Sequence, residues 1–186
     1  GTALRGLVSV TDPLSGATRT VDLEGNGTGS VAVTKTGSGT ITSLPAGLSC
    51  GANCTTSFAT ASIQLSASPD PGWTFSTWGG ACTGSATTCT LSLNAASTTV
   101  TATFVPVYTL TVAPTGNGLV TSAPAGISCG ADCSETVNYN TTLVLTATPT
   151  AGSTFTGWSG GGCSGTGTCS VAVTANTTVT ATFTLN

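Results

Sequence analysis

The stretch that decides the fold is residues 155–183, FTGWSGGGCSGTGTCSVAVTANTTVTATF, because the chain contains it twice. Residues 75–104, FSTWGGACTGSATTCTLSLNAASTTVTATF, repeat the same features in the same order. In both copies an aromatic pair leads into a Gly-rich loop, and two cysteines bracket that loop. A run that alternates Thr with apolar residues then closes the stretch. A period of about 80 residues is typical of a tandem array of domains and not of a solenoid of short units.

The correspondence between the copies extends well beyond this stretch. The first copy contains Cys50, Cys54, Trp78, Cys82, Cys89 and Phe104, and these match Cys129, Cys133, Trp158, Cys163, Cys169 and Phe183. We therefore predict one module over residues 30–106 and a second over residues 107–186. Residues 1–29 lie outside the repeat.

The pattern within each module predicts strands only. Runs in which Thr or Ser alternates with apolar residues indicate strands with one face on a core and one face in water. No window shows the 3.6-residue period of a helix. The expected strands of the first module are 31–34, 39–42, 63–67, 73–75, 90–93 and 99–104, and those of the second are 108–112, 118–121, 143–147, 154–155, 170–173 and 178–183. A glycine-containing turn separates the first two strands of each module, so we expect them to form a hairpin. The predicted fold class is all-β, with two tandem small disulfide-containing modules preceded by a β-hairpin.

The sequence pattern of residues 1–29 predicts a β-hairpin at the N-terminus. Residues 7–11 and 18–23 alternate as strands around the turn-forming segment Asp12-Pro13-Leu14-Ser15-Gly16. Because an isolated two-stranded hairpin is only marginally stable in water, we expect it to pack on the first module or on a neighbouring molecule. Its candidate contact residues are Leu7, Val8, Val10, Val21 and Leu23.

The composition excludes several classes of function. The chain has 3 basic and 6 acidic side chains and no histidine, with a net charge of −3. Such a chain has no basic surface for nucleic acid or for an anionic membrane, and no apolar run approaches the length of a membrane-spanning helix. Without histidine, a Ser–His or Cys–His nucleophile cannot be assembled. We therefore predict no catalytic residues, no cofactor, no nucleic-acid partner and no membrane insertion.

The eight cysteines divide equally between the modules. An even number at matched spacings predicts disulfides and a secreted or cell-surface location. Pairing Cys50 with Cys54 and Cys82 with Cys89, and their counterparts likewise, requires only tight turns. A long-range link such as Cys50 to Cys89 would restrict the unfolded chain more. It would stabilise the fold by about 4 kcal/mol, against roughly 2–2.5 kcal/mol for each local link. We favour the local pairs, although spacing does not decide the geometry. Zinc binding is the other reading of four cysteines, but the usual Cys-x2-Cys spacing is missing.

Three further features have a functional and a structural reading. Asp132 and Glu135 could contribute to a calcium loop, but the first module has Asn53 and Thr56 there, which favours a solvated turn. Trp78 and Trp158 could stack on sugars, yet their recurrence in both modules favours a role in packing. Trp73 occurs only in the first module and is the better candidate for an exposed aromatic contact.

Several short motifs of both modules occur together in a known family. In the second module they are Gly126-Ile127-Ser128-Cys129-Gly130 with Cys133, Leu143-x-Leu145-Thr146-Ala147-x-Pro149, Phe155-x-Gly157-Trp158-Ser159-Gly160, Cys163, Cys169 and Val179-Thr180-Ala181-x-Phe183. Together they resemble the divergent InlB B-repeat, a module found in tandem in bacterial surface and secreted proteins. The first module departs from this pattern at Ser76-Thr77-Trp78 and has the additional Trp73. The segment from Thr20 to Gly27 resembles the last strand of immunoglobulin-like domains of the choice-of-anchor type.

The resemblance implies a small all-β module that serves as a stalk or adhesion element, and it implies no catalytic residues. From the sequence we expect a non-enzymatic extracellular structural or adhesion module, such as a stalk or filament segment. One alternative is a self-assembling extracellular fibre in which the hairpin adds strands to a neighbouring subunit. Another is a carbohydrate-binding module. The expected partners are neighbouring protein subunits or other domains of the same protein, and glycans under the last alternative.

Overall fold

The computed structural model describes residues 4–11, 18–25, 29–93 and 97–186, and these ranges contain strands, turns and bends but no helix. Accordingly, no helix in these ranges has the length and hydropathy needed to cross a membrane. The all-β prediction is confirmed. The strands are β1 (Leu4–Thr11), β2 (Thr18–Gly25), β3 (Gly29–Thr36), β4 (Gly39–Leu44), β5 (Ser49–Cys50), β6 (Cys54–Phe58), β7 (Ser62–Pro69), β8 (Trp73–Gly80), β9 (Thr88–Ser92), β10 (Ser97–Thr115), β11 (Gly118–Ala123), β12 (Ser128–Cys129), β13 (Ser134–Asn138), β14 (Thr141–Pro149), β15 (Ser153–Ser159), β16 (Cys169–Val173) and β17 (Thr177–Leu185).

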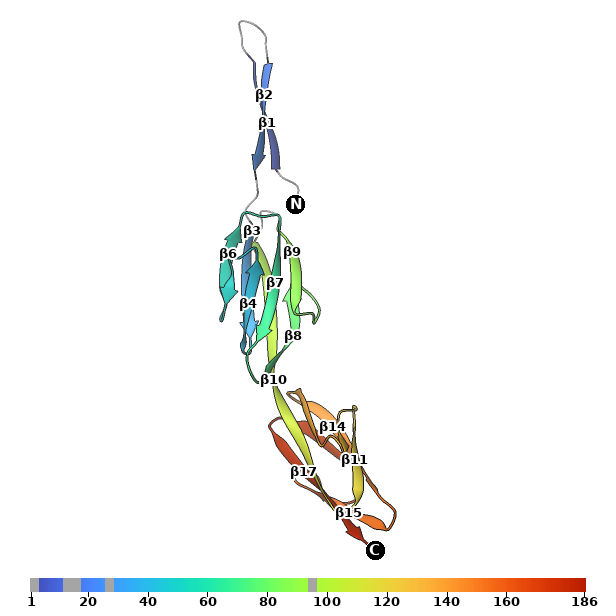
Figure 1. Cartoon of the computed structure of the whole chain (residues 1–186). Helices are drawn as coiled ribbons and strands as arrows, with labels where there is room; N and C mark the ends of the chain where they lie inside the picture. Colours follow the sequence, from blue (N-terminus) through green and yellow to red (C-terminus); the bar gives the residue numbers. More distant parts are fainter. Residues whose placement is uncertain (1–3, 12–17, 26–28, 94–96) are drawn as a thin grey trace. The chain divides into compact units, whose positions relative to one another are not determined.

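The chain forms two compact units, residues 1–104 and 105–186. Within the first unit, the first module comprises β3 to β9 and the first half of β10, and it is a sandwich of two sheets (Figure 1). One sheet has the order β6-β3-β10-β8, and the other has the order β5-β4-β7-β9. Alternate side chains of both sheets point inward and form one buried cluster. Strand β7 shows the principle, because its buried residues Ile63, Leu65 and Ala67 alternate with more exposed ones.

The prediction of a hairpin between the first two strands of each module is wrong. Strands β3 and β4 do not pair with each other, because β3 belongs to one sheet and β4 to the other. The turn between them holds Gly37 at φ 78°, where a Cβ atom would lie 2.2 Å from the carbonyl oxygen of Phe104. This glycine lets the turn pass close against the last strand of the module, so the chain crosses from one sheet to the other.

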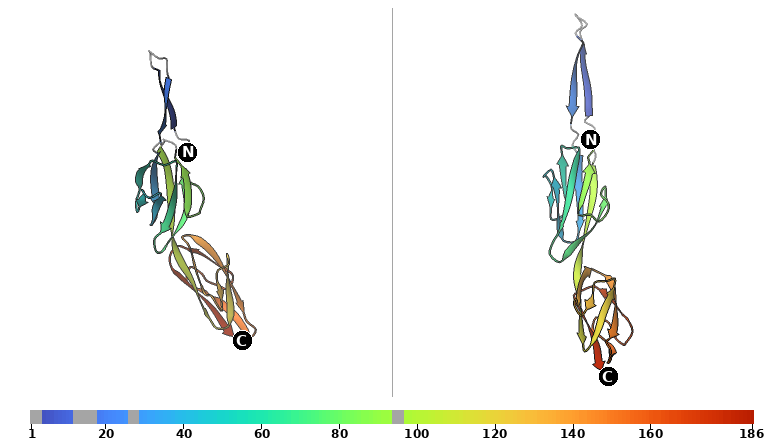
Figure 2. Two further views of the ribbon diagram at one scale, coloured as in Figure 1. Left: turned by 45° about the horizontal axis from the view of Figure 1, so that its top comes forward. Right: turned by 45° about the vertical axis from the view of Figure 1, so that its right-hand side comes forward.

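The second module, residues 105–186, has the same architecture. Its sheets have the orders β13-β10-β17-β15 and β12-β11-β14-β16, and they enclose a second buried cluster. Figure 2 shows the strands of this module, coloured yellow to red, from two further directions. Strands β6 and β13 were missed in the sequence because Cys54-Thr55-Thr56-Ser57-Phe58 and its counterpart contain few apolar residues. Each of them is an edge strand, so only a few of its side chains reach the core.

Strand β10 is shared by the two modules. Its residues Ser97–Thr103 pair with β3, and its residues Leu110–Thr115 pair with β17. The strands expected at 99–104 and at 108–112 are therefore two parts of one element. The last strand of the first module continues into the first strand of the second without an intervening turn.

The N-terminal hairpin is present as predicted. Strands β1 and β2 pair antiparallel, with Leu4 opposite Gly25 and Thr11 opposite Thr18. Within the described residues these two strands form a sheet of their own.

Candidate functional site

Each module has two disulfides, and each disulfide joins an edge of one sheet to an edge of the other. The structure pairs Cys50 with Cys54, Cys82 with Cys89, Cys129 with Cys133, and Cys163 with Cys169. This is the local arrangement that the sequence favoured. In the first module, Cys50 lies in β5 and Cys54 in β6, which are edge strands of different sheets. Cys89 lies in β9, and Cys82 follows β8, which are again edge strands of different sheets. The short disulfide loops therefore link the layers of the sandwich, a role that is not apparent from their spacing.

The repeated tryptophans hold the Gly-rich loops in place. Trp158 is only 5% exposed, and its indole Nε1 donates a hydrogen bond to the carbonyl oxygen of Gly167 at 2.6 Å. Its backbone N–H donates to Gly165 at 2.9 Å. Trp78 makes the equivalent indole bond in the first module, to Ala86 at 2.8 Å. Both polar and apolar parts of these side chains are satisfied inside the protein, so their rings are not free to stack on a sugar.

Each tryptophan also belongs to an aromatic cluster. The ring of Phe155 lies 5.0 Å from that of Trp158 and 5.2 Å from that of Phe183, measured between centroids. The first module repeats this cluster with Phe75, Trp78 and Phe104. The stretch that is repeated in the sequence therefore forms an aromatic cluster, which packs beside β8 in the first module and beside β15 in the second.

The structure places Trp73, the candidate for an exposed aromatic contact, at the start of β8. It is partly buried and packs against the core cluster of the first module. A Cβ atom added to Gly37 would lie 2.8 Å from its ring. The additional tryptophan covers the glycine turn between β3 and β4, which leaves only part of its ring available to a ligand.

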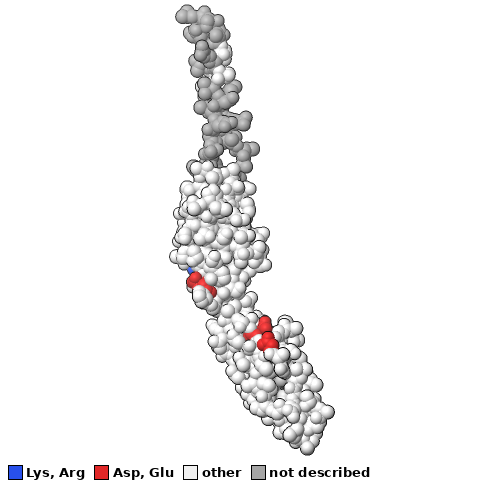
Figure 3. Space-filling model, viewed as in Figure 1, with Lys and Arg blue, Asp and Glu red and all other residues white. Residues whose placement is uncertain are grey.

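The outer face of the sheet β13-β10-β17-β15 is lined by hydroxyl groups. Threonines of neighbouring strands lie side by side, as where Thr111 is registered with Thr178 and Thr115 with Thr182. Thr109 and Thr136 share a hydrogen bond of 2.9 Å between their hydroxyls. Figure 3 shows that the described surface on the face in view has few charged side chains. Among β10, β13, β15 and β17 only β13 contains a charged residue, Glu135, so the hydroxyl-lined face offers polar groups to water and little electrostatic attraction to a partner.

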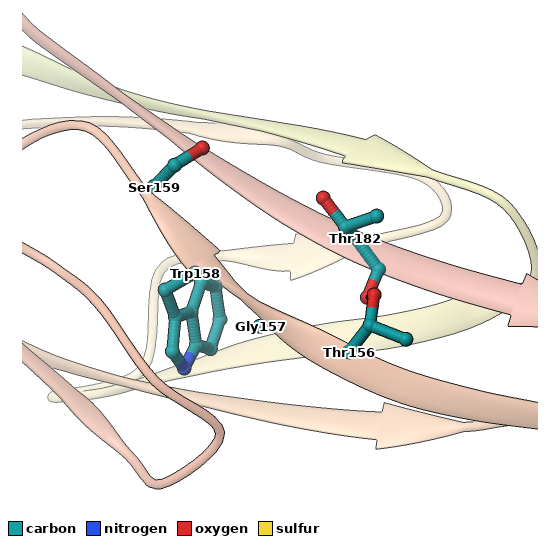
Figure 4. A pocket seen from close by; sticks show the side chains of 5 residues that line it. All are labelled: Thr156, Gly157, Trp158, Ser159 and Thr182. Atoms are coloured by element: carbon teal, nitrogen blue, oxygen red, sulfur yellow. The ribbon is translucent and has the colours of Figure 1, made fainter.

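A shallow depression lies on this face. It has a volume of about 220 Å³ and lies at the bulge of β15, where the register with β17 shifts between Phe155 and Gly157. Figure 4 shows Trp158 on the opposite side of β15 from Ser159 and Thr182. Thr156 uses its hydroxyl to donate to the carbonyl oxygen of Thr182 at 3.0 Å. The depression thus lacks a titratable group, and part of its polar lining is already hydrogen-bonded.

Three charged side chains of the modules make structural contacts. Lys35 donates from Nζ to the carbonyl oxygen of Gly39 at 2.8 Å and lies over the ring of Phe104. Asp70 accepts a hydrogen bond from Ser38. The carboxylate of Asp132 accepts the backbone N–H of Ser134 at 3.2 Å, which is the geometry of a turn.

No group of three or more potential metal ligands occurs in the described part of the chain. Asp132 and Glu135, considered above as part of a calcium loop, are not joined there by a third such ligand. The calcium reading therefore gains no support from their arrangement.

The candidate contact residues of the hairpin are only partly placed. Val8 is 46% exposed. The side chains of Leu7, Val10, Val21 and Leu23 lie outside the described residues. That these residues contact a partner remains a prediction of the sequence.

Two asparagine side chains form bonds that sequence reasoning missed. The Oδ1 atom of Asn176 accepts the backbone N–H of Thr109 at 2.9 Å, and that of Asn53 accepts the backbone N–H of Lys35 at 2.8 Å. Each bond connects a loop to the first strand of its module. Asparagine is common in loops, and these partners are separated by 67 and 18 residues, so no local signal could have identified them.

The divergent InlB B-repeat domain matches this chain twice, over residues 29–107 and over residues 108–186. The chain belongs to the divergent InlB B-repeat family. The resemblance of the cysteine, tryptophan and closing-strand motifs is therefore confirmed. The immunoglobulin-like character of the segment before the repeats is not part of this match and stays a prediction.

No curated protein sequence matches this member of the divergent InlB B-repeat family. Among solved structures, it is similar to the major pilin protein (T-13) from Streptococcus pyogenes serotype GAS131465. The match has 10% sequence identity and a TM-score of 0.32, and it covers 86% of this chain and 97% of the pilin. At that TM-score the similarity supports no argument about function.

Proposed function

We propose that this protein is a non-enzymatic extracellular structural module, a stalk or filament segment that spaces or supports an adhesive part of a bacterial surface or secreted protein. The observation that carries the proposal is the way the two modules are joined. Strand β10 ends one sandwich and begins the next, so the repeat is extended by a continuous strand. Such a direct connection suits a protein that serves as a spacer.

The side chains support a role outside the cell. All eight cysteines form disulfides that link the sheets of their module. Such bonds persist in oxidising compartments, where small domains use them to supplement a limited core. The hydroxyl-lined, weakly charged outer face keeps the sheet hydrated without favouring a charged partner.

The proposal is tested by locating the modules on the cells that produce them. Gold-labelled antibodies against residues 29–186 should bind intact cells or material that these cells release, and electron microscopy should show the label outside the envelope. Label that appears only after lysis would contradict an extracellular role. A cytoplasmic protein of the same cells, probed in parallel, serves as the control for intactness.

A second candidate, the self-assembling fibre, is favoured by the hairpin. Within the described residues β1 and β2 pair only with each other, so each leaves one edge without a strand partner in this chain. An open edge is a template for strand addition from a neighbouring subunit. Removing residues 1–28 should then abolish polymers that the complete chain forms, as followed by light scattering and electron microscopy. A complete chain that remains monomeric at high concentration would contradict this candidate.

The carbohydrate-binding alternative has the weakest support, because the repeated tryptophans are buried and hydrogen-bonded. Among the three tryptophans only Trp73 is partly exposed, and Tyr139 offers a ring that is 53% exposed. A glycan array provides the test, with the Trp73→Ala variant as the matched comparison. Binding that this variant loses would restore the alternative.

A further inference from the structure

The first and last strands of each module lie side by side and run in the same direction. In the first module, β3 pairs in parallel with β10 over seven residues, Ser30–Thr36 against Ser97–Thr103. In the second, β10 pairs in parallel with β17 over six residues, Leu110–Thr115 against Thr177–Thr182. The chain enters each module along one of these strands and leaves along the other.

Both strands of each pair are central in their sheet. The orders β6-β3-β10-β8 and β13-β10-β17-β15 place an edge strand on each outer side of the pair. Their inward residues belong to the most buried part of the core, as Val31, Val100, Leu110 and Val179 are fully buried. The pair is therefore shielded from water, which would otherwise compete for its hydrogen bonds.

This topology decides how a module responds to tension between its ends. A pull on the chain draws the first strand back toward its amino end and draws the last strand forward toward its carboxyl end. Because the two strands are parallel neighbours, the pull acts along the strands and across their evenly spaced hydrogen bonds. All these bonds are then loaded together in shear, and no single bond can open before the others.

We propose that the parallel pair of terminal strands is a mechanical clamp, which gives each module the further function of bearing tensile load. This inference deepens the structural role proposed above and rests on it for its biological meaning. The clamp itself is a property of the fold. The clamp binds no ligand; it resists tension that passes along the chain through β10.

Several contacts reinforce the carboxyl end of the pair in both modules. The turns after β3 and after β10 place Gly37 and Gly116 against the carbonyl oxygens of Phe104 and Phe183, at distances that leave no room for a Cβ atom. Gly39 lies in the same way against the ring of Phe104. These turns would have to pass over the phenylalanine before the first strand could slide along the last.

The amino end of the second pair has an additional bond. Asn176 directly precedes the first paired residue of β17, and its Oδ1 accepts the N–H of Thr109, directly before the first paired residue of β10. The side chain therefore continues the series of backbone bonds by one position. It is placed to be loaded together with the backbone bonds of the clamp.

The disulfides do not cross the clamp. They close segments with sequence separations of 4 and 7 in the first module and of 4 and 6 in the second. Once the clamp opens, almost the whole module can extend, by about 200 Å at about 3.5 Å per residue. Reducing the disulfides should add about 25 Å to each extension, because the closed segments then also become available. An extension of about 200 Å that grows by about 25 Å on reduction therefore identifies the unfolding of a complete module.

The experiment compares two directions of pulling on the same protein in optical tweezers or a force microscope. In the first, handles are attached to the two ends of the complete chain, and both clamps are loaded in shear. In the second, one handle is inserted at Asn117, in the exposed turn after β10, and the other is attached at the C-terminus. Thr115 is registered with Thr182, so these handles act at the same end of the pair and peel the strands apart one bond at a time.

End-to-end pulling should give two unfolding events of about 200 Å each, with forces at least about twofold higher than in the peeling direction, because rupture under force follows the barrier to unfolding. Equal forces in the two directions would overturn the clamp. Calorimetry of both handled proteins ensures that the comparison is made at equal thermal stability. Force and location are measured separately, so a ratio near one with label outside the cell rejects only the clamp. A high ratio with label only after lysis rejects only the extracellular role.

A matched pair of variants tests the position of the resistance. Asn176→Ala removes a side-chain bond between the elements of the clamp, whereas Thr156→Val removes a bond of similar length from β15 to the backbone of β17. The first should lower the force of one end-to-end event, and the second should leave both events unchanged. A loss of force in Thr156→Val that equals or exceeds that in Asn176→Ala would locate the resistance outside the pair and overturn the proposal.

Discussion

Replacing Cys163 and Cys169 by alanine removes one of the two links between the sheets of the second module. The pair has a sequence separation of 6, and the chain-entropy relation for a loop of this size predicts a loss of about 2.3 kcal/mol in the free energy of unfolding. Cys129 and Cys133, with a separation of 4, should contribute about 2 kcal/mol by the same relation. A long-range link such as Cys129 to Cys169 would instead contribute about 4 kcal/mol.

These losses are large for a module of this size. A domain is typically stable by about 5–15 kcal/mol, and 1 kcal/mol shifts the melting temperature of a small domain by about 4–8 °C. The Cys163→Ala, Cys169→Ala double variant should therefore lower the melting temperature of the second module by about 10–18 °C. Removing both pairs should roughly double that shift.

Scanning calorimetry of the complete chain provides the measurement, and the first module serves as an internal reference. The variant should move one transition and leave the other in place. The equivalent variant of Cys82 and Cys89 is the matched control, and it should move the transition of the first module instead. Two results would refute the reasoning: a shift below about 5 °C, or mass mapping without reduction that links cysteines from different loops.

Three further substitutions test individual contacts in the second module by chemical denaturation. Trp158→Ala should destabilise the module by about 3–5 kcal/mol, because it empties a buried site and frees the Gly-rich loop; a loss below about 1 kcal/mol would mean that the tryptophan is not part of the core. Gly116→Ala should lower the free energy of unfolding clearly more than Gly152→Ala. Both glycines have φ near 80°, but only at Gly116 would an added Cβ atom meet an obstacle, the carbonyl oxygen of Phe183 at 2.0 Å. Equal losses for the two variants would show that the backbone angle alone matters. Asn176→Ala should cost about 0.5–1.5 kcal/mol through its single bond to β10, and unchanged stability would show that water replaces it.

Much of the local structure could be predicted from the sequence. The alternation of Thr and Ser with apolar residues indicated strands and also the face of each strand that is buried, as β7 and β17 show. The paired spacings of cysteine and tryptophan indicated two equivalent modules. These properties are local, because the two-residue period of a strand and the conformational preferences of glycine and proline act within a few residues.

The predictions failed where a strand depends on neighbours that are distant in the chain. The edge strand β13 was missed because Glu135 and Thr136 do not alternate with strongly apolar residues, and its place depends on pairing with β10. Trp73 was a candidate for an exposed contact because it has no counterpart, and its packing against the core of its own module was not foreseen. In both cases the deciding contact leaves no pattern in the local sequence.

By itself, then, the sequence determined that this protein is a disulfide-containing β protein of two repeated modules, since composition, period and cysteine spacing are readable without knowing which strands meet. Only the tertiary structure decided that β3 and β4 lie in different sheets, that the short disulfide loops link those sheets, and that the first and last strands of each module are parallel neighbours. The physical reason is that alternation specifies the face of a strand but not its partner. The partner is chosen by the packing of the whole core, and in this protein that choice places the two ends of each module on adjacent strands.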